Sequence, residues 1–399
     1  MVCMNNSSIS FNAADRIASF KPYFFVILAR QITALKASGM DIIRLDMGSP
    51  DLAPDPSIIK RLSEQAERND THGYAPSGGT VEFREGVAEY YQKRFGVQLD
   101  PVKEVHGLIG SKEGLFALSQ VILNPGDVSL VSDPGYPVYS ASGIIAGAEV
   151  VSVPLLEQNG FLPDLKAIPA DKLKRAKVIW VNYPNNPTGA TADEHFYEEL
   201  IEFAHRHKIL IAHDLAYADV TYDGYKAPSI LQFAGAKEVA VEFNSLSKSY
   251  NMAGWRLGMA VGNPQVLDYL GTYKSQQDTS HFIPVLSAGA LAMTGSQEWL
   301  IARNNIYAER RQVVLDALES VGLKAGKPKA AIYIWVKIPG SITSAEYCSK
   351  LLEETGVSTT PGSVYGSYGE GFLRISLCIA AGRLSEAMER MTGWVKKTS

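Results

Sequence analysis

The stretch SLSKSYNMAGWRLG, residues 245–258, lies between two short apolar runs that are typical of buried strands, 239–243 before it and 258–262 at its end. Its first turn carries small hydroxyl side chains around a single lysine, Lys248. Because burial disfavours the charged form of an amine, a lysine directly after a buried strand is costly as a mere surface charge. Its place in the sequence therefore indicates chemistry that needs a neutral amine, such as Schiff-base formation.

The residues around Lys248 supply the hydrogen-bond donors that a phosphate group needs. Ser245 and Ser247 offer hydroxyl groups, and Arg256, eight residues after the lysine, offers a planar cationic guanidinium. An anion-binding set beside an activated amine suggests pyridoxal phosphate. The SLSK fragment alone fits equally well a polar turn whose lysine extends into solvent. The arginine between two glycines favours the cofactor site.

Length and composition narrow the class of protein. A chain of 399 residues, 46% hydrophobic and 20% charged, predicts a globular protein of about two domains. The net charge of −4 and the lack of any basic tract predict no nucleic-acid partner. Three widely spaced cysteines fit neither a disulfide framework nor a metal site, and predict a cytoplasmic location. No signal peptide and no run of about 18 apolar residues is present, so we expect no membrane span.

Between residues 104 and 262 apolar runs alternate with helical patterns. Unbroken apolar strands separated by helices predict an α/β fold with a largely parallel sheet that is covered on both faces. In such sheets ligands bind at the carboxyl ends of the strands, where the polar motifs of this chain fall. The predicted strands are 105–109, 128–131, 150–153, 178–181, 209–212, 239–243 and 259–261.

The pattern changes after about residue 285. A long helix over 297–321, a strand over 332–338, a helix over 344–354, a strand over 372–377 and a final helix predict a smaller α+β domain. Near the other end of the chain we expect one helix over 17–37. The predicted division is a segment 1–45 that packs on the small domain, a large domain 46–285 and a small domain 286–399.

Three polar motifs follow predicted strands and leave alternatives open. GSKEG, residues 110–114, opens a helix, and it fits either an anion site at the helix N-terminus or a simple cap by Ser111. DPGYPVY, residues 133–139, contains Tyr136, and a core position is the commoner fate of a tyrosine. NYPNNPTG, residues 182–189, has the composition of a turn.

Two charged residues stand within apolar strands and need partners. Asp214 ends the strand ILIAHD, and an unpaired buried carboxylate would be strongly destabilising. A cationic pyridinium or an arginine would supply its partner, and a pyridinium paired in this way makes a cofactor ring an electron sink. Arg374 lies in FLRISL, and its guanidinium matches a carboxylate in a bidentate manner.

The motif S-x-S-K-x-x-x-x-x-G-x-R-x-G resembles the cofactor-lysine signature of the class I/II aminotransferases, which are fold-type I pyridoxal-phosphate enzymes. The resemblance covers roughly residues 15–395, with six motifs in the family's order. The motifs THGY, GSKEG, DPGYPVY, HDLAYAD and YDGYKAPS are similar to the branch that holds LL-diaminopimelate aminotransferases and bacterial alanine aminotransferases. The resemblance implies a cytoplasmic homodimer active in amino-acid biosynthesis, with a large domain built on a mostly parallel sheet and a smaller α+β domain.

The resemblance also implies roles for particular residues. Lys248 would form the Schiff base with pyridoxal phosphate and move the α-proton, Asp214 would pair with the pyridinium, and Tyr217 would bond the phenolate oxygen. Tyr74 would reach the phosphate of the neighbouring subunit. The implied cofactor-binding residues are Tyr74, Ser111, Lys112, Tyr136, Asn186, Asp214, Tyr217, Ser245, Ser247, Lys248 and Arg256. The implied substrate-binding residues are Tyr23, Gly48, Asn186 and Arg374, with Arg374 holding the α-carboxylate.

The expected reaction moves an amino group from LL-diaminopimelate, alanine or an aspartate/glutamate-type donor to a 2-oxo acid such as 2-oxoglutarate or pyruvate. The segment 275–282 lies where the branch reads the distal end of the substrate, and His281 departs from the small or amide residue expected there. A β-elimination lyase or an α-oxoamine synthase would use the same lysine. A ligand-sensing domain of a regulator would need a DNA-binding module, for which the short N-terminus leaves no room. The lack of G-x-G-x-x-G disfavours a nicotinamide enzyme.

Overall fold

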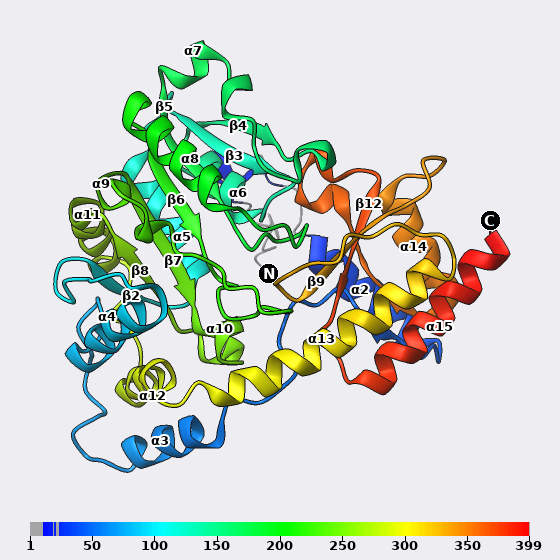
Figure 1. The fold of residues 1–399 in the computed structure, drawn as a ribbon, viewed down its shortest axis with the longest axis horizontal. Helices are drawn as coiled ribbons and strands as arrows, with labels where there is room; N and C mark the ends of the chain where they lie inside the picture. Colours follow the sequence, from blue (N-terminus) through cyan, green and yellow to red (C-terminus); the bar gives the residue numbers. More distant parts are fainter. Residues whose placement is uncertain (1–10, 19, 21–23, 399) are drawn as a thin grey trace, which may run out of the picture.

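The computed structural model of the chain describes residues 11–18, 20 and 24–398, and its centre is a seven-stranded sheet (Figure 1). The strands follow the order β2-β8-β7-β6-β5-β3-β4, and all of them run parallel except β8. Their bounds are β2 Val105–Leu108, β3 Val128–Asp133, β4 Glu149–Pro154, β5 Ala176–Val181, β6 Leu210–Asp214, β7 Ala240–Ser245 and β8 Gly258–Gly262.

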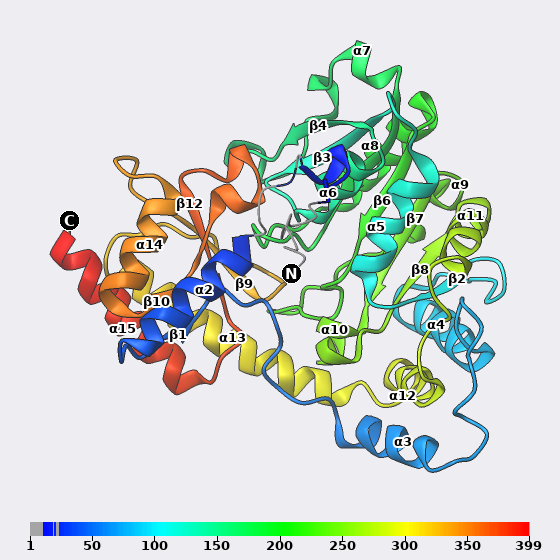
Figure 2. The same ribbon diagram turned by 180° about the vertical axis from the view of Figure 1, so that it is seen from behind.

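Helices cover both faces of this sheet (Figure 2), which explains why most side chains of its central strands are apolar. One face packs against α5 Ser111–Ile122, α6 Val138–Ile145 and α11 Pro264–Ser275. The other packs against α4 Val81–Phe95, α8 Glu194–His207 and the short α9 Ala236–Val239, with α3 Pro56–Ala66 and α12 Ile283–Thr294 behind α4. The α/β fold with a mostly parallel, doubly covered sheet, predicted from the alternating runs, is confirmed.

Local sequence explains where the covering helices begin and end. In α8 the side chain of Asp193 accepts a hydrogen bond from the Phe196 backbone N–H, which caps the first turn. Phe196, Leu200 and Phe203 then lie buried at helical spacing. The helix ends where Lys208 adopts a left-handed conformation with φ of 56°. The helical pattern expected between the predicted strands 178–181 and 209–212 is therefore present as α8.

The single antiparallel neighbour of β7 decides where the lysine motif lies. Ser245 pairs with Gly258 in the antiparallel register of β7 and β8, so residues 246–257 form one connection at one edge of the sheet. That connection contains the short helix α10 Leu246–Ser249 and a 3₁₀ turn over Ala253–Trp255. Lys248 and Arg256 consequently lie at the same end of the sheet as the carboxyl ends of β5, β6 and β7.

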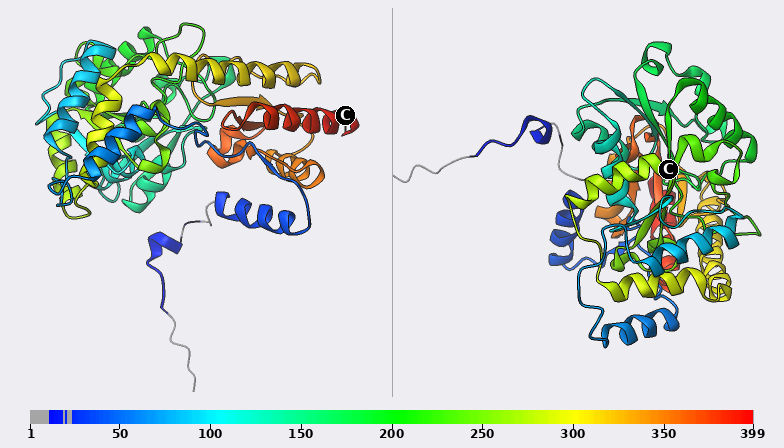
Figure 3. Two further views of the ribbon diagram at one scale, coloured as in Figure 1. Left: turned by 90° about the horizontal axis from the view of Figure 1, so that it is seen from below. Right: turned by 90° about the vertical axis from the view of Figure 1, so that its left-hand side faces the viewer.

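The C-terminal part of the chain forms a second, smaller group of strands (Figure 3). β11 Thr360–Pro361, β12 Phe372–Ser376 and β9 Tyr333–Lys337 make an antiparallel sheet, and β1 Ile43–Arg44 pairs in parallel with β10 Val357–Ser358. The long helix α13 Glu298–Glu319 runs from the large sheet to this group and packs on α15 Ala381–Thr398. The remaining helices are α1 Asp15–Ala18, α2 Phe24–Ala37, α7 Ala170–Leu173 and α14 Ser344–Thr355.

The N-terminal part departs from the expected single helix over 17–37. The described residues there form α1 and α2, Phe20 between them belongs to no helix, and β1 follows as a strand of two residues. The division of the chain at residues 45 and 285 stays a prediction. In the described residues no helix is long and apolar enough to cross a membrane.

Candidate active site

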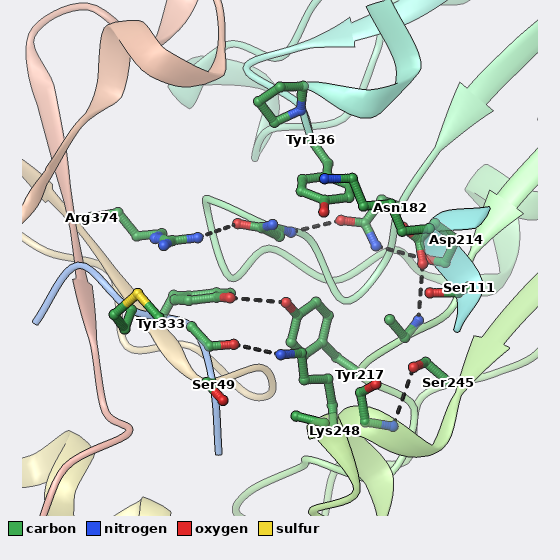
Figure 4. Close-up of a pocket in the computed structure, with 18 of the residues that line it drawn as sticks. Ser49, Ser111, Tyr136, Asn182, Asp214, Tyr217, Ser245, Lys248, Tyr333 and Arg374 are labelled. Atoms are coloured by element: carbon green, nitrogen blue, oxygen red, sulfur yellow. Dashed lines mark hydrogen bonds between the residues drawn. The ribbon is translucent and has the colours of Figure 1, made fainter. Parts of the chain in front are cut away.

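A cavity of about 380 Å³ opens between the carboxyl ends of β5, β6 and β7 on one side and β9 and β12 on the other (Figure 4). All but two of the residues predicted for the site line it. They are Gly48, Ser111, Lys112, Tyr136, Asn186, Asp214, Tyr217, Ser245, Ser247, Lys248, Arg256 and Arg374. The two exceptions are Tyr74, which does not line the cavity, and Tyr23, which lies outside the described residues.

Lys248 lies in α10 and extends its amine into the cavity, where Nζ donates a hydrogen bond to the carbonyl oxygen of Gly48 (Figure 4). Burial lowers the pKa of this amine to about 8, and the cations of Arg374 and Arg256 act in the same direction. Among the described residues it forms no ion pair with a carboxylate. A large fraction of the amine is therefore neutral near pH 8.

Asp214 ends β6, and its carboxylate faces the same cavity. Its oxygens accept hydrogen bonds from the Tyr139 hydroxyl at 2.8 Å and from the Ala216 backbone N–H at 3.2 Å. Burial raises the pKa of this carboxyl to about 6, against these two bonds. Within the described chain no cationic side chain forms an ion pair with it. Asn182, which sequence reasoning missed, donates to the Asp214 carbonyl at 2.6 Å.

The N-terminus of α5 and the guanidinium of Arg256 lie side by side and could bind an anion. Gly110 precedes α5 with φ of 72°, and no side chain caps the first turn, so its backbone N–H groups remain available. A Cβ atom at Gly110 would overlap Arg256 Nη2, so only glycine permits this approach. Burial, followed by the Arg256 cation, lowers the pKa of Lys112, which lies in the same turn.

His281 holds the backbone of Arg256 rather than lining the cavity of its own chain. Its Nε2 lies 2.6 Å from the Arg256 carbonyl oxygen and donates to it, while its buried Nδ1 has no hydrogen-bond partner in the described chain. Arg256 adopts a left-handed conformation with φ of 58°, which a non-glycine residue seldom takes. None of residues 275–282 lines this cavity in the single chain.

Arg374 emerges from β12 at the opposite wall, and it is 3% exposed. Nη1 donates to Asn186 Oδ1 and Nη2 to the Asp46 carbonyl, both at 2.8 Å. Nε is buried without a hydrogen-bond partner in the described chain, and neither bonded oxygen belongs to an anion. This guanidinium therefore retains donor capacity for an anionic group such as a carboxylate.

Tyr217 and Tyr333 meet across the cavity, with their hydroxyl oxygens 3.0 Å apart (Figure 4). Sequence reasoning identified Tyr217 and missed Tyr333, because a tyrosine in an apolar strand has the pattern of a core residue. Tyr365, Met47 and Phe25 also line the cavity and were not among the predicted site residues. No local signal distinguishes these side chains from the core.

Tyr74 lies in the loop between α3 and α4 and is 92% exposed. A tyrosine exposed to this extent has few contacts within its own chain. The position agrees with neither a core role nor a role in the cavity of its own subunit. Its expected contact with a neighbouring subunit stays a prediction.

Comparison with known proteins adds a family and several relatives. A family model described as aminotransferase class I and II matches residues 40–391. The chain is 47% identical to the LL-diaminopimelate aminotransferase of Moorella thermoacetica over 378 residues, which are 95% of this chain and 97% of that protein. The substrate-bound BacF structure from Bacillus subtilis is 36% identical with a TM-score of 0.93, covering 96% of this chain and 98% of that one. A mutant aspartate aminotransferase of Thermus thermophilus is 30% identical with a TM-score of 0.90, covering 96% and 100%.

Proposed function

We propose, given that this chain belongs to the family of class I and II aminotransferases and is a transaminase, that it uses pyridoxal phosphate to exchange amino groups between LL-diaminopimelate and a 2-oxo acid. The family assignment that the lysine motif suggested is confirmed by the match over residues 40–391. The cofactor, the donor and the role of each residue are our inference, and they are argued below from the cavity.

The observation that carries the proposal is a set of three ionisable residues without ion pairs, of which Asp214 and Arg374 are buried and Lys248 is half-buried. Lys248, Asp214 and Arg374 line one cavity, and within the described chain none of them forms an ion pair with another side chain. Leaving three such groups unpaired is costly unless a ligand supplies the partners. The required ligands are an aldehyde for the amine, a cationic ring nitrogen for Asp214 and a carboxylate for Arg374.

Pyridoxal phosphate and an amino acid together meet these requirements. The uncapped first turn of α5, the hydroxyls of Ser245 and Ser247, and Arg256 would hold the phosphate. Asp214 would hold the ring nitrogen. When bound, the cofactor would supply an electron sink for the electron pair left at the substrate's α-carbon. The donor set of this chain therefore fits the group.

The residues of the chain would then orient the substrate and move its proton. Arg374 would hold the α-carboxylate, with Asn186 fixing the guanidinium from the other side. The neutral amine of Lys248 would accept the proton from the α-carbon of the substrate. The same amine would then deliver the proton to C4′ of the cofactor. Its pKa of about 8 suits a base that must both take and release a proton near neutral pH.

Two features support particular partners. LL-diaminopimelate is our preferred donor because relatives with that name are 43–47% identical along nearly the whole chain. Alanine and aspartate/glutamate-type donors, with 2-oxoglutarate or pyruvate as acceptor, remain the competing substrates. We also propose a homodimer, because Tyr74 is exposed on the single chain. A cytoplasmic location stays a prediction from cysteine usage.

One experiment tests the cofactor assignment. The protein reconstituted with pyridoxal phosphate is reduced with borohydride, digested, and its peptides are mapped. We expect the reduced cofactor on Lys248, and a tag on any other lysine would refute the assignment. A panel of single amino acids, scored by loss of the cofactor's long-wavelength absorbance, then ranks the donors. If LL-diaminopimelate without an acceptor causes a lasting loss of this absorbance, the reaction is transamination. Elimination would instead release product and restore the absorbance.

A further inference from the structure

Tyr333 joins two parts of the site that serve different ends of the substrate. It lies on β9, is 3% exposed, and lines the cavity. Its hydroxyl lies 3.0 Å from that of Tyr217, and its ring centroid lies 3.9 Å from the guanidinium carbon of Arg374. In Figure 4 the Tyr333 side chain lies on the Arg374 side of the cavity with its hydroxyl toward Tyr217.

The chain makes room for this hydroxyl at one specific position. A Cβ atom at Gly48 would overlap the Tyr333 hydroxyl oxygen and would lie 2.8 Å from Cζ. Real Cβ atoms do not approach other atoms so closely, so glycine at 48 is a condition for the contact between Tyr333 and Tyr217. The same glycine offers its carbonyl oxygen to Lys248. A residue expected to contact substrate therefore has a second reason to be small.

The hydrogen bond between the two tyrosines restricts where each proton points. Either hydroxyl could donate by geometry alone. Burial raises the pKa of both hydroxyls, and the Arg374 cation acts against burial at both. The pKa of Tyr333, whose ring lies against the guanidinium, is raised less than that of Tyr217, so the Tyr333 hydroxyl is the better donor. If Tyr333 donates, the single proton of Tyr217 is directed elsewhere, and Tyr217 has no other hydrogen-bond partner among the described residues. That proton is then available to an acceptor in the cavity.

We propose that Tyr333 is a positioning residue that directs the Tyr217 proton into the cavity through its hydroxyl and braces Arg374 through its ring. The inference rests on the proposed function, in which Tyr217 donates to the phenolic oxygen of the cofactor and Arg374 holds the carboxylate. The hydroxyl and the ring act on different partners. Their removal should therefore have separable effects.

The hydroxyl is tested by the pKa that is read from the absorbance of the bound cofactor during a pH titration. A donor to the phenolic oxygen favours the deprotonated form, so a weakened donor raises this pKa. We expect Tyr333→Phe to raise it by roughly 0.5 to 1 unit, the size of one lost neutral hydrogen bond. The other titratable or charged groups that line the cavity are unchanged in this variant: Asp46, Lys112, Tyr136, Asp214, Tyr217, Lys248, Arg256, Tyr365 and Arg374.

A matched control separates this effect from a general loosening of β9. Tyr222 donates its hydroxyl to the carbonyl oxygen of Ala331, close to the start of β9, and does not line the cavity. Tyr222→Phe removes a buried hydrogen bond of the same type without touching Tyr217. We expect it to leave the cofactor pKa at the wild-type value.

The ring is tested with succinate, a carboxylate that binds but cannot transfer an amino group. Tyr333→Phe keeps a ring over Arg374 and should bind succinate as the wild type does. Tyr333→Leu removes the ring and should weaken succinate binding roughly three- to thirtyfold, the range of a buried cation–π contact. If Tyr333→Leu fails to fold, Tyr333→Met, which also has no ring and keeps a long apolar side chain, takes its place in the succinate titration. Gly48→Ala is a second test of the hydroxyl, because its Cβ atom would displace that group from the other side. Its pKa rise should not add to that of Tyr333→Phe in the double variant.

The possible results separate the inference from the function on which it rests. If the bound cofactor titrates in the wild-type protein and Tyr333→Phe leaves its pKa unchanged, the role of the hydroxyl is overturned and the proposed function stands. Equal succinate affinity in Tyr333→Leu and wild type overturns the role of the ring. A wild-type protein that binds no pyridoxal phosphate would overturn the proposed function and the inference with it.

Discussion

Arg303 Nη1 lies 2.8 Å from the backbone carbonyl oxygen of Lys248 and donates a hydrogen bond to it, although the two residues are far apart in sequence. The same guanidinium donates to the carbonyls of Ser249 and Asp219, each at 2.6 Å. Arg303 projects from α13, is 3% exposed, and pairs with no carboxylate in the described chain. It therefore fixes the backbone on which the reactive lysine stands.

Removing this guanidinium should destabilise the protein and displace the lysine. Arg303→Leu leaves the carbonyl oxygens of Lys248 and Ser249 without their donor, whereas that of Asp219 keeps a hydrogen bond from the Asn304 amide. We expect the free energy of unfolding to fall by about 2–5 kcal/mol. Urea titration measures the loss. Arg383→Leu is the control, since the Arg383 side chain is 39% exposed and ion pairs in contact with solvent contribute little to stability. Equal losses of unfolding free energy in the two variants would contradict a stabilising role for the buried hydrogen bonds of Arg303.

The pH dependence of stability should reveal the unpaired amine of Lys248. Its folded pKa is about 8 and its ordinary value is 10.5, so burial penalises the charged form. Below pH 8 the amine is protonated in both the folded and the unfolded protein, so the full free-energy cost of burying its charge destabilises the folded state. Between about pH 8 and 10.5 the unfolded state binds more protons, so stability rises with pH, and above that range the penalty is gone. In cofactor-free protein, Lys248→Met should therefore be more stable at pH 7 by on the order of 3 kcal/mol, and this difference should vanish by pH 10.5.

A second buried lysine gives the contrasting result. Lys274 has a fully buried side chain, and its Nζ lies 3.2 Å from Glu113 and 2.7 Å from Asp278. Because its charge is paired, Lys274→Met should lower the free energy of unfolding at pH 7 by about 3–5 kcal/mol. Calorimetry or urea titration at pH 7 checks that Lys248→Met raises the free energy of unfolding and that Lys274→Met lowers it. Stabilisation by both substitutions would show that burial alone, and not pairing, decides the outcome.

Arg374 should contribute equally to every amino donor. The α-carboxylate is common to all of them, so Arg374→Ala should lower kcat/KM by a similar factor throughout a donor panel, corresponding to about 2–5 kcal/mol. Steady-state kinetics with LL-diaminopimelate, alanine, aspartate and glutamate measures this factor. An enzyme that keeps wild-type efficiency on one donor and loses the rest would make Arg374 a reader of the distal group.

His281 should influence the anion site rather than the choice of substrate. Burial lowers the pKa of His281, so its imidazole is neutral at pH 7 and Nε2 donates to the Arg256 carbonyl. His281→Ala should weaken cofactor binding roughly three- to tenfold, the equivalent of one hydrogen bond. His281→Gln retains a donor and should recover part of the loss. Equilibrium dialysis measures the affinity, and an altered donor ranking at unchanged affinity would instead support the expected role of segment 275–282 in specificity.

The shared-site prediction for Tyr74 can be tested by mixing subunits. Lys248→Ala protein should be inactive, and Tyr74→Ala protein should bind cofactor weakly while keeping its dimeric mass. In a mixed dimer one site combines an intact Lys248 with the partner's intact Tyr74. We therefore expect refolded mixtures to regain activity that neither parent has. Tyr368→Ala, another exposed tyrosine, is the control, and a fully active monomer at nanomolar concentration would contradict the dimer.

The sheet could be predicted from the sequence because its signals are local. Each central strand is a mostly apolar run bounded by polar turns. Asp193, Thr80 and Thr343 mark helix starts through their side-chain caps. The residues of the candidate site were found because a lysine, an aspartate and an arginine within apolar runs are conspicuous. Burial of a charge is a local anomaly that points to a partner.

The parts that could not be predicted depend on contacts between distant segments. Tyr333 has the pattern of any core tyrosine, and its role depends on Tyr217 and Gly48, which belong to other elements. Arg303 resembles a surface arginine of a long helix until the helix is placed against α10. The two-residue β1 has no periodicity of its own, and its pairing with β10 defines it.

The antiparallel direction of β8 has a consequence for how this chain tolerates change. Because Ser245 pairs with Gly258, the twelve-residue excursion between them must leave and re-enter the sheet at the same edge. A parallel β8 would have required a crossover that carries the arginine to the far edge, away from the lysine. The number of residues in this excursion is thus as constrained as their identity. We therefore expect insertions and deletions within residues 246–257 to be selected against in related proteins, even where surface substitutions elsewhere are tolerated.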